Sequence, residues 1–203
     1  MQHLIVATRN AHKTREIQRI LGADFSVSDL SAYPEISETL ESGKTFEENA
    51  ILKAVTVSGQ VKGLVVADDS GLEVDALGGA PGIHSARYAG ANASDKEKID
   101  KLLSELGKIS AKGDQPVARF RCVLALARDG QILGTFEGVV EGEIAGQARG
   151  SHGFGYDPIF LPRGFGRTFG EFAPAEKDWW SHRARALEKL RAFLNTVPGS
   201  AKK

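Results

Sequence analysis

The sequence predicts an α/β protein, and three patterns support this fold class. Short β-branched apolar runs at residues 4–8 and 64–67 are each followed by polar residues, as buried strands are. Capping-box patterns at 45–48 and 94–97 precede amphipathic segments and mark helix starts. A turn sequence, Asp129-Gly130, separates two long strand-like runs and is typical of a hairpin.

Composition narrows the class of protein. The 203 residues carry 26 Lys and Arg against 26 Asp and Glu, and this zero net charge argues against a nucleic-acid-wrapping surface. The single cysteine, Cys122, lies in an apolar run and fits a reducing compartment. Neither a signal peptide nor a membrane-spanning run is evident, so we expect a cytoplasmic protein with no membrane partner. We predict a single domain over residues 1–197 and a disordered tail over 198–203.

The first strand leads into a polar turn, residues 9–13, and then into a helix that ends at Gly22. Exposed N–H groups at a helix start, with Lys13 in the first turn, suit a polyphosphate. The glycine spacing of a P-loop is absent. The alternative is that Asn10 only caps the helix and that Lys13 is solvated.

The strand at 64–67 runs directly into Asp68 and Asp69. We expect this pair at the carboxyl edge of the sheet, where ligands bind in open α/β folds. Adjacent carboxylates repel each other, and a hard cation such as Mg²⁺ would compensate their charge while also binding substrate phosphates. A solvated Asp-Ser-Gly turn is an equally good interpretation of these residues alone.

The middle of the chain supplies the remaining elements. Residues 25–28 alternate as a strand, and Thr45 begins a helix that stops near Gly59 or Gly63. Lys53 on that helix could reach a phosphate, although a lone helical lysine is usually solvated. The helix after Ser94 ends at Gly107, and strands are expected at 117–127 and 132–144.

Residues 150–160 form a loop in which glycines flank aromatic residues, a pattern that packing alone explains poorly. An aromatic ring held there could stack on a base and contribute roughly 1–3 kcal/mol, with Asp157 as a cap or anchor. The final helix is predicted to start near Pro174 and to bury one of Trp179 and Trp180. By spacing alone, His182 and Arg183 belong to its solvated face.

Several stretches together resemble one family, the inosine/xanthosine triphosphate pyrophosphatases that act on non-standard purine nucleotides. The matching pieces are Ala7-Thr8-x-Asn10-x-x-Lys13, Glu41-x-Gly43-x-Thr45-Phe46-x-Glu48-Asn49-Ala50-x-x-Lys53-Ala54, Ala67-Asp68-Asp69-Ser70-Gly71-Leu72, Leu77-Gly78-Gly79-Ala80-Pro81-Gly82-Ile83-x-Ser85-Ala86-Arg87-Tyr88, Gly153-Phe154-Gly155-Tyr156-Asp157-Pro158-Ile159-Phe160 and Glu176-Lys177 through Ser181-His182-Arg183. Each piece alone is weak, but six in this order are very specific.

The resemblance implies an elongated mixed β-sheet flanked by helices, two lobes with a central substrate cleft, and a homodimer. It implies Mg²⁺-dependent hydrolysis of ITP, dITP, XTP or dXTP to a monophosphate and pyrophosphate. Asp69 would be the proton acceptor, and Glu41, Asp68 and Asp69 would form the metal site. The implied substrate-binding residues are Thr8, Arg9, Asn10, Ala11, His12, Lys13, Lys53, Ser70, Phe154, Gly155, Tyr156, Asp157, Lys177, His182 and Arg183.

The sequence departs from the family pattern at two places. Arg9 stands where a small residue is usual, and Trp179-Trp180 precedes Ser-His-Arg in place of smaller residues. We expect the tryptophans to pack in the core rather than to reshape the base pocket.

Two other functions stay open at this point. The first is a phosphatase with an aspartyl nucleophile, which would release inorganic phosphate. The adjacent aspartates argue against it, because that chemistry usually separates the two by one residue. The second is a non-enzymatic nucleotide-binding protein, against which the acidic cluster argues.

A base site that offers hydrogen-bond donors, from Arg183, His182 or backbone N–H groups of the Phe154 loop, would favour a 6-oxo purine over adenine.

Overall fold

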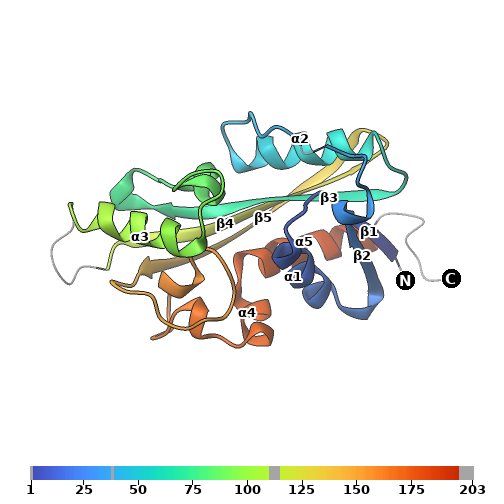
Figure 1. The fold of residues 1–203 in the computed structure, drawn as a ribbon. Helices are drawn as coiled ribbons and strands as arrows, with labels where there is room; N and C mark the ends of the chain where they lie inside the picture. The colour runs from blue at the N-terminus through green and yellow to red at the C-terminus, as the bar shows by residue number, and fades with distance from the viewer. Residues whose placement is uncertain (1, 38, 110–114, 197–203) are drawn as a thin grey trace. The chain divides into compact units, whose positions relative to one another are not determined.

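The chain is described by a computed structural model that covers residues 2–37, 39–109 and 115–196 (Figure 1). It divides into two compact units. The first comprises the residues through Asp69, Cys122–Gly138 and those from Ser181 on; the second comprises Ser70–Arg121 and Val139–Trp180. The predicted tail, residues 198–203, lies outside the described ranges. Among the helices in these ranges, none is long and apolar enough to cross a membrane.

A six-stranded mixed sheet with the order β2-β1-β3-β4-β5-β6 confirms the predicted α/β class. Strand β1 (Gln2–Val6) pairs in parallel with β2 (Phe25–Asp29) and with β3 (Leu64–Val74). The predicted hairpin is β4 (Val117–Arg128) and β5 (Gln131–Ile144). Asp129 and Gly130 join them with φ angles of 52° and 73°, as two-residue hairpin turns require. The edge strand β6 (Phe160–Pro162) runs antiparallel to β5.

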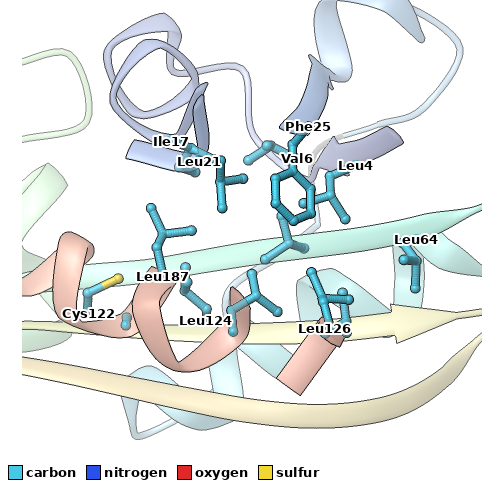
Figure 2. Close-up of a cluster of buried hydrophobic side chains, with 14 residues drawn as sticks. Leu4, Val6, Ile17, Leu21, Phe25, Leu64, Cys122, Leu124, Leu126 and Leu187 are labelled. Carbon is cyan, nitrogen blue, oxygen red and sulfur yellow. The ribbon is translucent and has the colours of Figure 1, made fainter. Parts of the chain in front are cut away.

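The core of the first unit lies between the sheet and two helices, α1 (Ala11–Leu21) and α5 (His182–Thr196). Helix α2 (Phe46–Ser58) lies on the opposite side of β3 (Figure 1). Figure 2 shows Ile17 and Leu21 of α1 and Leu187 of α5 directed at the leucines and valine of the strands. Alternation along the strands and helical periodicity therefore place their apolar faces together, as the sequence pattern predicts.

The second unit has its own core, built on α3 (Asp95–Leu106) and on aromatic side chains. The rings of Phe120 and Phe160 lie 4.6 Å apart, and Phe169 packs 5.4 Å from Phe160. Helix α4 (Pro174–Trp180) also belongs to this unit. Short 3₁₀ helices occur at Gly22–Asp24, Leu30–Ala32, Asp75–Leu77, Gly82–Arg87, Asp157–Ile159 and Phe169–Glu171.

The two predicted capping boxes differ in the structure. At α3, Ser94 and Glu97 satisfy each other's backbone N–H groups, so that box is complete. At α2, Thr45 Oγ1 accepts the N–H of Glu48 at 3.1 Å, but the Glu48 carboxylate accepts the N–H of Lys44 instead. Thr45 is therefore the cap, and Glu48 secures the turn that precedes it.

The prediction of one continuous final helix is wrong. Helix α4 ends at Trp180, and α5 begins at His182. Ser181 lies between them, and its Oγ accepts the N–H of Ala184 at 3.1 Å, as an N-cap hydroxyl does. A new helix start at Ser181 thus replaces the continuous apolar stripe that was expected.

The expectation that the tryptophans pack in the core is also wrong. Trp179 is 81% exposed and Trp180 is 47% exposed. Both lie on α4, of which only Lys177 is buried. Trp180 meets the ring of Phe165 edge-on at 5.4 Å. The inner face of α5 is filled by its own leucines, so the tryptophans are not needed there.

We expect Trp179→Ser to change the free energy of unfolding by no more than about 0.5 kcal/mol, because an exposed ring loses little burial. Phe172→Ala, in the core of the same unit, should cost about 3–5 kcal/mol. Urea unfolding of both variants measures the difference. A loss of several kcal/mol for Trp179→Ser would show that the ring is buried after all.

Candidate functional site

The Asp68-Asp69 pair lies within a strand and not at its end. Strand β3 continues through Ser70 and Gly71 to Val74, so the expected position at a sheet edge and the alternative Asp-Ser-Gly turn are both wrong. The reason is that Leu72 and Val74 are as buried as the residues before the pair, and they extend the strand. Because successive side chains of a strand point to opposite faces, the two carboxylates point to opposite sides of the sheet.

On the side of α2, Asp69 meets a lysine that also binds Glu41. Lys53 Nζ donates to Asp69 Oδ1 and to Glu41 Oε1, both at 2.8 Å, and to the carbonyl of Asp68 at 3.0 Å. Lys53 is therefore not the solvated lysine of the simpler interpretation. Asn49, one turn earlier on α2, is buried and accepts the N–H of Gly43 at 2.8 Å, which anchors the segment that carries Glu41.

Asp69 has the properties of a proton acceptor. Burial raises the pKa of its carboxyl above the ordinary value, although Lys53 and Lys13 partly offset this effect. Its Oδ2 is buried and has no hydrogen-bond partner among the residues that the structure describes. An ionised carboxylate with one oxygen anchored and the other unpaired can accept a proton from a nearby water.

On the side of α1 and α5, Asp68 is enclosed by cations. Lys13 Nζ lies 2.5 Å from its Oδ1 and 3.3 Å from its carbonyl oxygen. Arg183 Nε donates to Oδ2 at 2.8 Å, and Arg183 Nη1 also pairs with Glu16. The thiol of Cys122 donates to the same Oδ2 at 3.2 Å. All these groups lie in the first unit.

These charges balance in a buried setting. Burial opposes ionisation of Asp68, but Arg183 and Lys13 hold the pKa of its carboxyl well below the ordinary value. Burial and the Asp68 carboxylate raise the pKa of the Cys122 thiol well above its ordinary value, so the thiol stays protonated and donates. Arg183 is only 1% exposed, so the prediction of a solvated face from spacing is wrong for this residue.

The turn at residues 8–13 is held mainly by its own side chains. Asn10 Oδ1 accepts the N–H groups of His12 and Lys13, which confirms its cap role, and Thr8 Oγ1 accepts the N–H of Asn10. The Arg9 guanidinium donates to the carbonyls of Leu30 at 2.8 Å and Ile36 at 2.7 Å. Arg9 therefore anchors the segment at residues 30–36, which follows β2. His12 and Ala11 are exposed.

The acidic residues differ in how well they fit a metal ion. No group of three or more His, Cys, Asp or Glu side chains in the described ranges is arranged to hold one. Both oxygens of Asp68 are already engaged by cations. Asp69 Oδ2, which has no such partner within the described part of the chain, is the oxygen that fits a cation. Glu41 is close by, because it binds the same lysine, Lys53, as Asp69 does. Mg²⁺ is often held by one or two carboxylates plus substrate phosphates, which matches this pair.

In the second unit, Lys177 and Asp157 form a buried pair beneath an aromatic ring. Lys177 Nζ donates to Asp157 Oδ2 at 2.6 Å, and both side chains are at most 4% exposed. The same Oδ2 accepts the N–H of Phe154 at 2.8 Å, and the ammonium lies 5.1 Å from the centroid of the Phe154 ring. A Cβ at Gly153, where φ is 76°, would come within 1.9 Å of that oxygen. The loop therefore needs a glycine at this position.

Two further contacts hold this loop. Tyr156 is buried, and its hydroxyl donates to the carbonyl of Ser85 at 3.0 Å. Burial, together with the nearby Tyr88 and Asp95, raises the pKa of this hydroxyl, which keeps it a donor. The N–H of Gly155 donates to Asp95 Oδ2 at 2.6 Å. With the Asp157 contact, these bonds support the prediction of an anchored loop.

The structure gathers the predicted residues into two groups. One contains Glu41, Asp68, Asp69, Lys13, Lys53 and Arg183 in the first unit; the other contains Phe154, Gly155, Tyr156, Asp157 and Lys177 in the second. His182 is buried at the start of α5, so the prediction of a solvated face is wrong for this residue as well. Ser70 is half-buried in β3.

Sequence reasoning missed Glu16, Asp95 and a role for Cys122. Glu16 follows Lys13 by three residues and adjoins Ile17 on the buried face of α1, and this helical spacing was the available signal.

The whole chain is similar to known proteins. A family model described as the Ham1 family matches residues 4–193. A dITP/XTP pyrophosphatase of Bacillus licheniformis is 49% identical, with 96% of this chain and 99% of the relative covered. The dITP/XTP pyrophosphatase of Bacillus subtilis is 47% identical, with coverages of 96% and 98%. The structure of a HAM1 protein from Coxiella burnetii matches with a TM-score of 0.85 at 41% identity, covering 97% of this chain and 100% of that one.

Proposed function

The chain belongs to the Ham1 family, and on that premise we propose that it is a pyrophosphatase of non-standard purine nucleoside triphosphates. It hydrolyses ITP, dITP, XTP or dXTP between the α- and β-phosphates and releases the monophosphate and pyrophosphate. The observation that carries this proposal is the placement of Asp69. Its carboxylate is buried, shares Lys53 with Glu41, and has one oxygen without a partner in the described part of the chain.

The lysines supply the positive charge that the reaction needs. A triphosphate carries about four negative charges, so its cleavage depends mainly on positioning and charge stabilisation. Lys13 and Lys53 both contact the carbonyl of Asp68 and so lie close together. We assign them to the oxygens of the leaving pyrophosphate. Asp68 keeps Lys13 in place, and Arg183 and Glu16 keep Asp68 in place.

Asp69 acts as the general base on the attacking water. Its raised pKa makes it a stronger base than an ordinary aspartate, and a positioned base typically contributes about 10²–10⁴-fold in rate. Asp69 and Glu41 would hold Mg²⁺ together with substrate phosphates. When bound, that ion lowers the pKa of water and neutralises phosphate charge. Asp68 is left out of the proposed metal site because both its oxygens bind cations of the protein.

Base recognition is assigned to the Phe154 loop. The ring of Phe154 offers a stacking surface. The N–H groups of Phe154 and Gly155 already donate to carboxylates, as does the Arg183 guanidinium. Lys177, whose ammonium lies 5.1 Å from the centroid of that ring, is the proposed partner of a 6-oxo group. Adenine would set its amino group against this donor.

Product analysis with ITP and Mg²⁺ tests the reaction, and we expect pyrophosphate and IMP. We expect kcat/KM for ITP and XTP to exceed that for ATP by at least tenfold, since one donor–donor mismatch costs on the order of 1–3 kcal/mol. GTP is assayed beside them. Release of inorganic phosphate would indicate the aspartyl phosphatase, nucleotide binding without turnover would indicate a binding protein, and a preference for ATP would contradict the assignment of the base site.

We further propose a homodimer in the cytoplasm that takes no nucleic acid and no membrane as partner. The zero net charge and the single, buried cysteine support this environment. Light scattering at micromolar concentration tests the oligomer, and a monomeric mass would contradict it.

A further inference from the structure

Asp95 binds two elements at once. It is the first residue of α3, and its Oδ1 pairs with Lys98 at 2.6 Å on the same helix. An acid at this position is ordinary, because it interacts favourably with the helix dipole. Its other oxygen, Oδ2, accepts the N–H of Gly155, 60 residues away in the sequence, at 2.6 Å. The helix-start role explains only one of these two oxygens.

The Gly155 N–H belongs to the peptide bond that follows Phe154. Because a peptide unit is planar, a hydrogen bond to this N–H fixes the orientation of the whole peptide plane between Phe154 and Gly155. Gly153 and Gly155 flank Phe154 with φ angles of 76° and 62°. Glycine adopts such positive φ angles more readily than any other residue. A segment with such backbone freedom keeps one conformation only if other contacts hold it.

The contacts of the loop differ in what they fix. The bond from the Phe154 N–H to Asp157 closes the loop on itself. The Tyr156 hydroxyl anchors a side chain to Ser85. The Asp95 bond joins the backbone next to Phe154 to a helix that is packed into the core by Ile99, Leu102 and Leu106. It is charge-assisted and short, and so belongs to the stronger class of hydrogen bonds.

We infer that Asp95 is a positioning residue for nucleobase recognition, which orients the Phe154–Gly155 peptide and through it the Phe154 ring. The inference rests on the proposed function, in which that ring stacks on the base. It predicts that loss of the Asp95 carboxylate weakens binding of ligands that carry a purine and leaves binding of a bare phosphate chain unchanged.

Calorimetric binding of IMP and of inorganic triphosphate to the full chain tests this. In Asp95→Ala we expect Kd for IMP to rise about tenfold, as for loss of one hydrogen bond to a charged group, and Kd for triphosphate to stay within about twofold. Asp95→Asn keeps an acceptor and should recover most of the affinity. Asp100→Ala is the matched control, since Asp100 is an exposed acid of the same helix that pairs with Lys96.

In turnover of ITP, Asp95→Ala should raise KM about tenfold with kcat within about twofold, which is the signature of lost uniform binding. If Asp95→Ala is unfolded by circular dichroism, Asp95→Glu carries the same expectation. It keeps the charge at the helix start but moves the carboxylate by one methylene.

Equal weakening of both ligands, or an unchanged Kd for IMP, would overturn the inference. A parent protein that binds IMP but does not hydrolyse ITP would contradict the proposed function. The inference about Asp95 would then still be decided by the Kd values for IMP and triphosphate. A parent protein that does not bind IMP would contradict both.

Discussion

Asp69→Asn should retain nucleotide binding and lose about 10²–10⁴-fold of its kcat with ITP. The amide keeps the shape of the side chain but cannot take a proton from water. Lys53 and Glu41 remain in place to hold phosphate and charge. Steady-state turnover gives kcat, and calorimetric titration with IMP gives the affinity. Asp75→Asn, an exposed acid beyond the end of the same strand, is the control and should leave kcat unchanged.

The pH profile gives a second check on Asp69. Burial raises the pKa of this carboxyl above the ordinary value of 3.8 in the metal-free chain, and a bound cation lowers it again, so the fall of kcat/KM on acidification should move to higher pH when the Mg²⁺ concentration is reduced. The sign follows from the role: the base must be ionised, so activity is present above the pKa and is lost as the pH falls through it. Full activity of Asp69→Asn at saturating Mg²⁺ would show that another group is the base.

Arg183→Met should cost about 3–5 kcal/mol of unfolding free energy, the usual effect of removing one partner from a buried ion pair. The substitution leaves Asp68 and Glu16 buried with less compensating charge. Chemical denaturation at neutral pH measures the loss. Arg191→Met is the matched control on the same helix. Its ion pair with Asp24 is about half exposed on both sides, so we expect no more than about 1 kcal/mol.

The loss in Arg183→Met should depend on pH. In the parent protein the pKa of Asp68 is depressed, so its ionisation stabilises the fold above the unfolded-state pKa of about 3.8, and this contribution is lost as the pH falls through the folded-state pKa. The difference in unfolding free energy between Arg183→Met and its parent should therefore shrink as the pH falls below about 3.8. A difference that stays constant with pH would show that lost packing, and not charge, causes the destabilisation.

Local patterns in the sequence predicted most of the elements but not the position of the acidic pair. The hairpin turn at Asp129-Gly130, the cap at Asn10 and the capping box at Ser94 are all found in the structure. Each depends on residues within a few positions of one another. The Asp68-Asp69 pair was misplaced because the end of a strand depends on whether the following residues are buried, and burial is not a local property.

The sequence by itself determined the α/β class, most strands, most helix boundaries and, through its ordered motifs, the resemblance to one family, since backbone preferences and motif spacing are written in neighbouring residues. It did not predict the edge strand β6. Only the tertiary structure decided that Asp68 and Asp69 face different partners, that Arg183 is buried and that Trp179 is exposed. Arg183 and Asp68 are 115 residues apart in the chain. Whether such groups meet, and whether their charges are stabilised away from water, depends on how the elements pack.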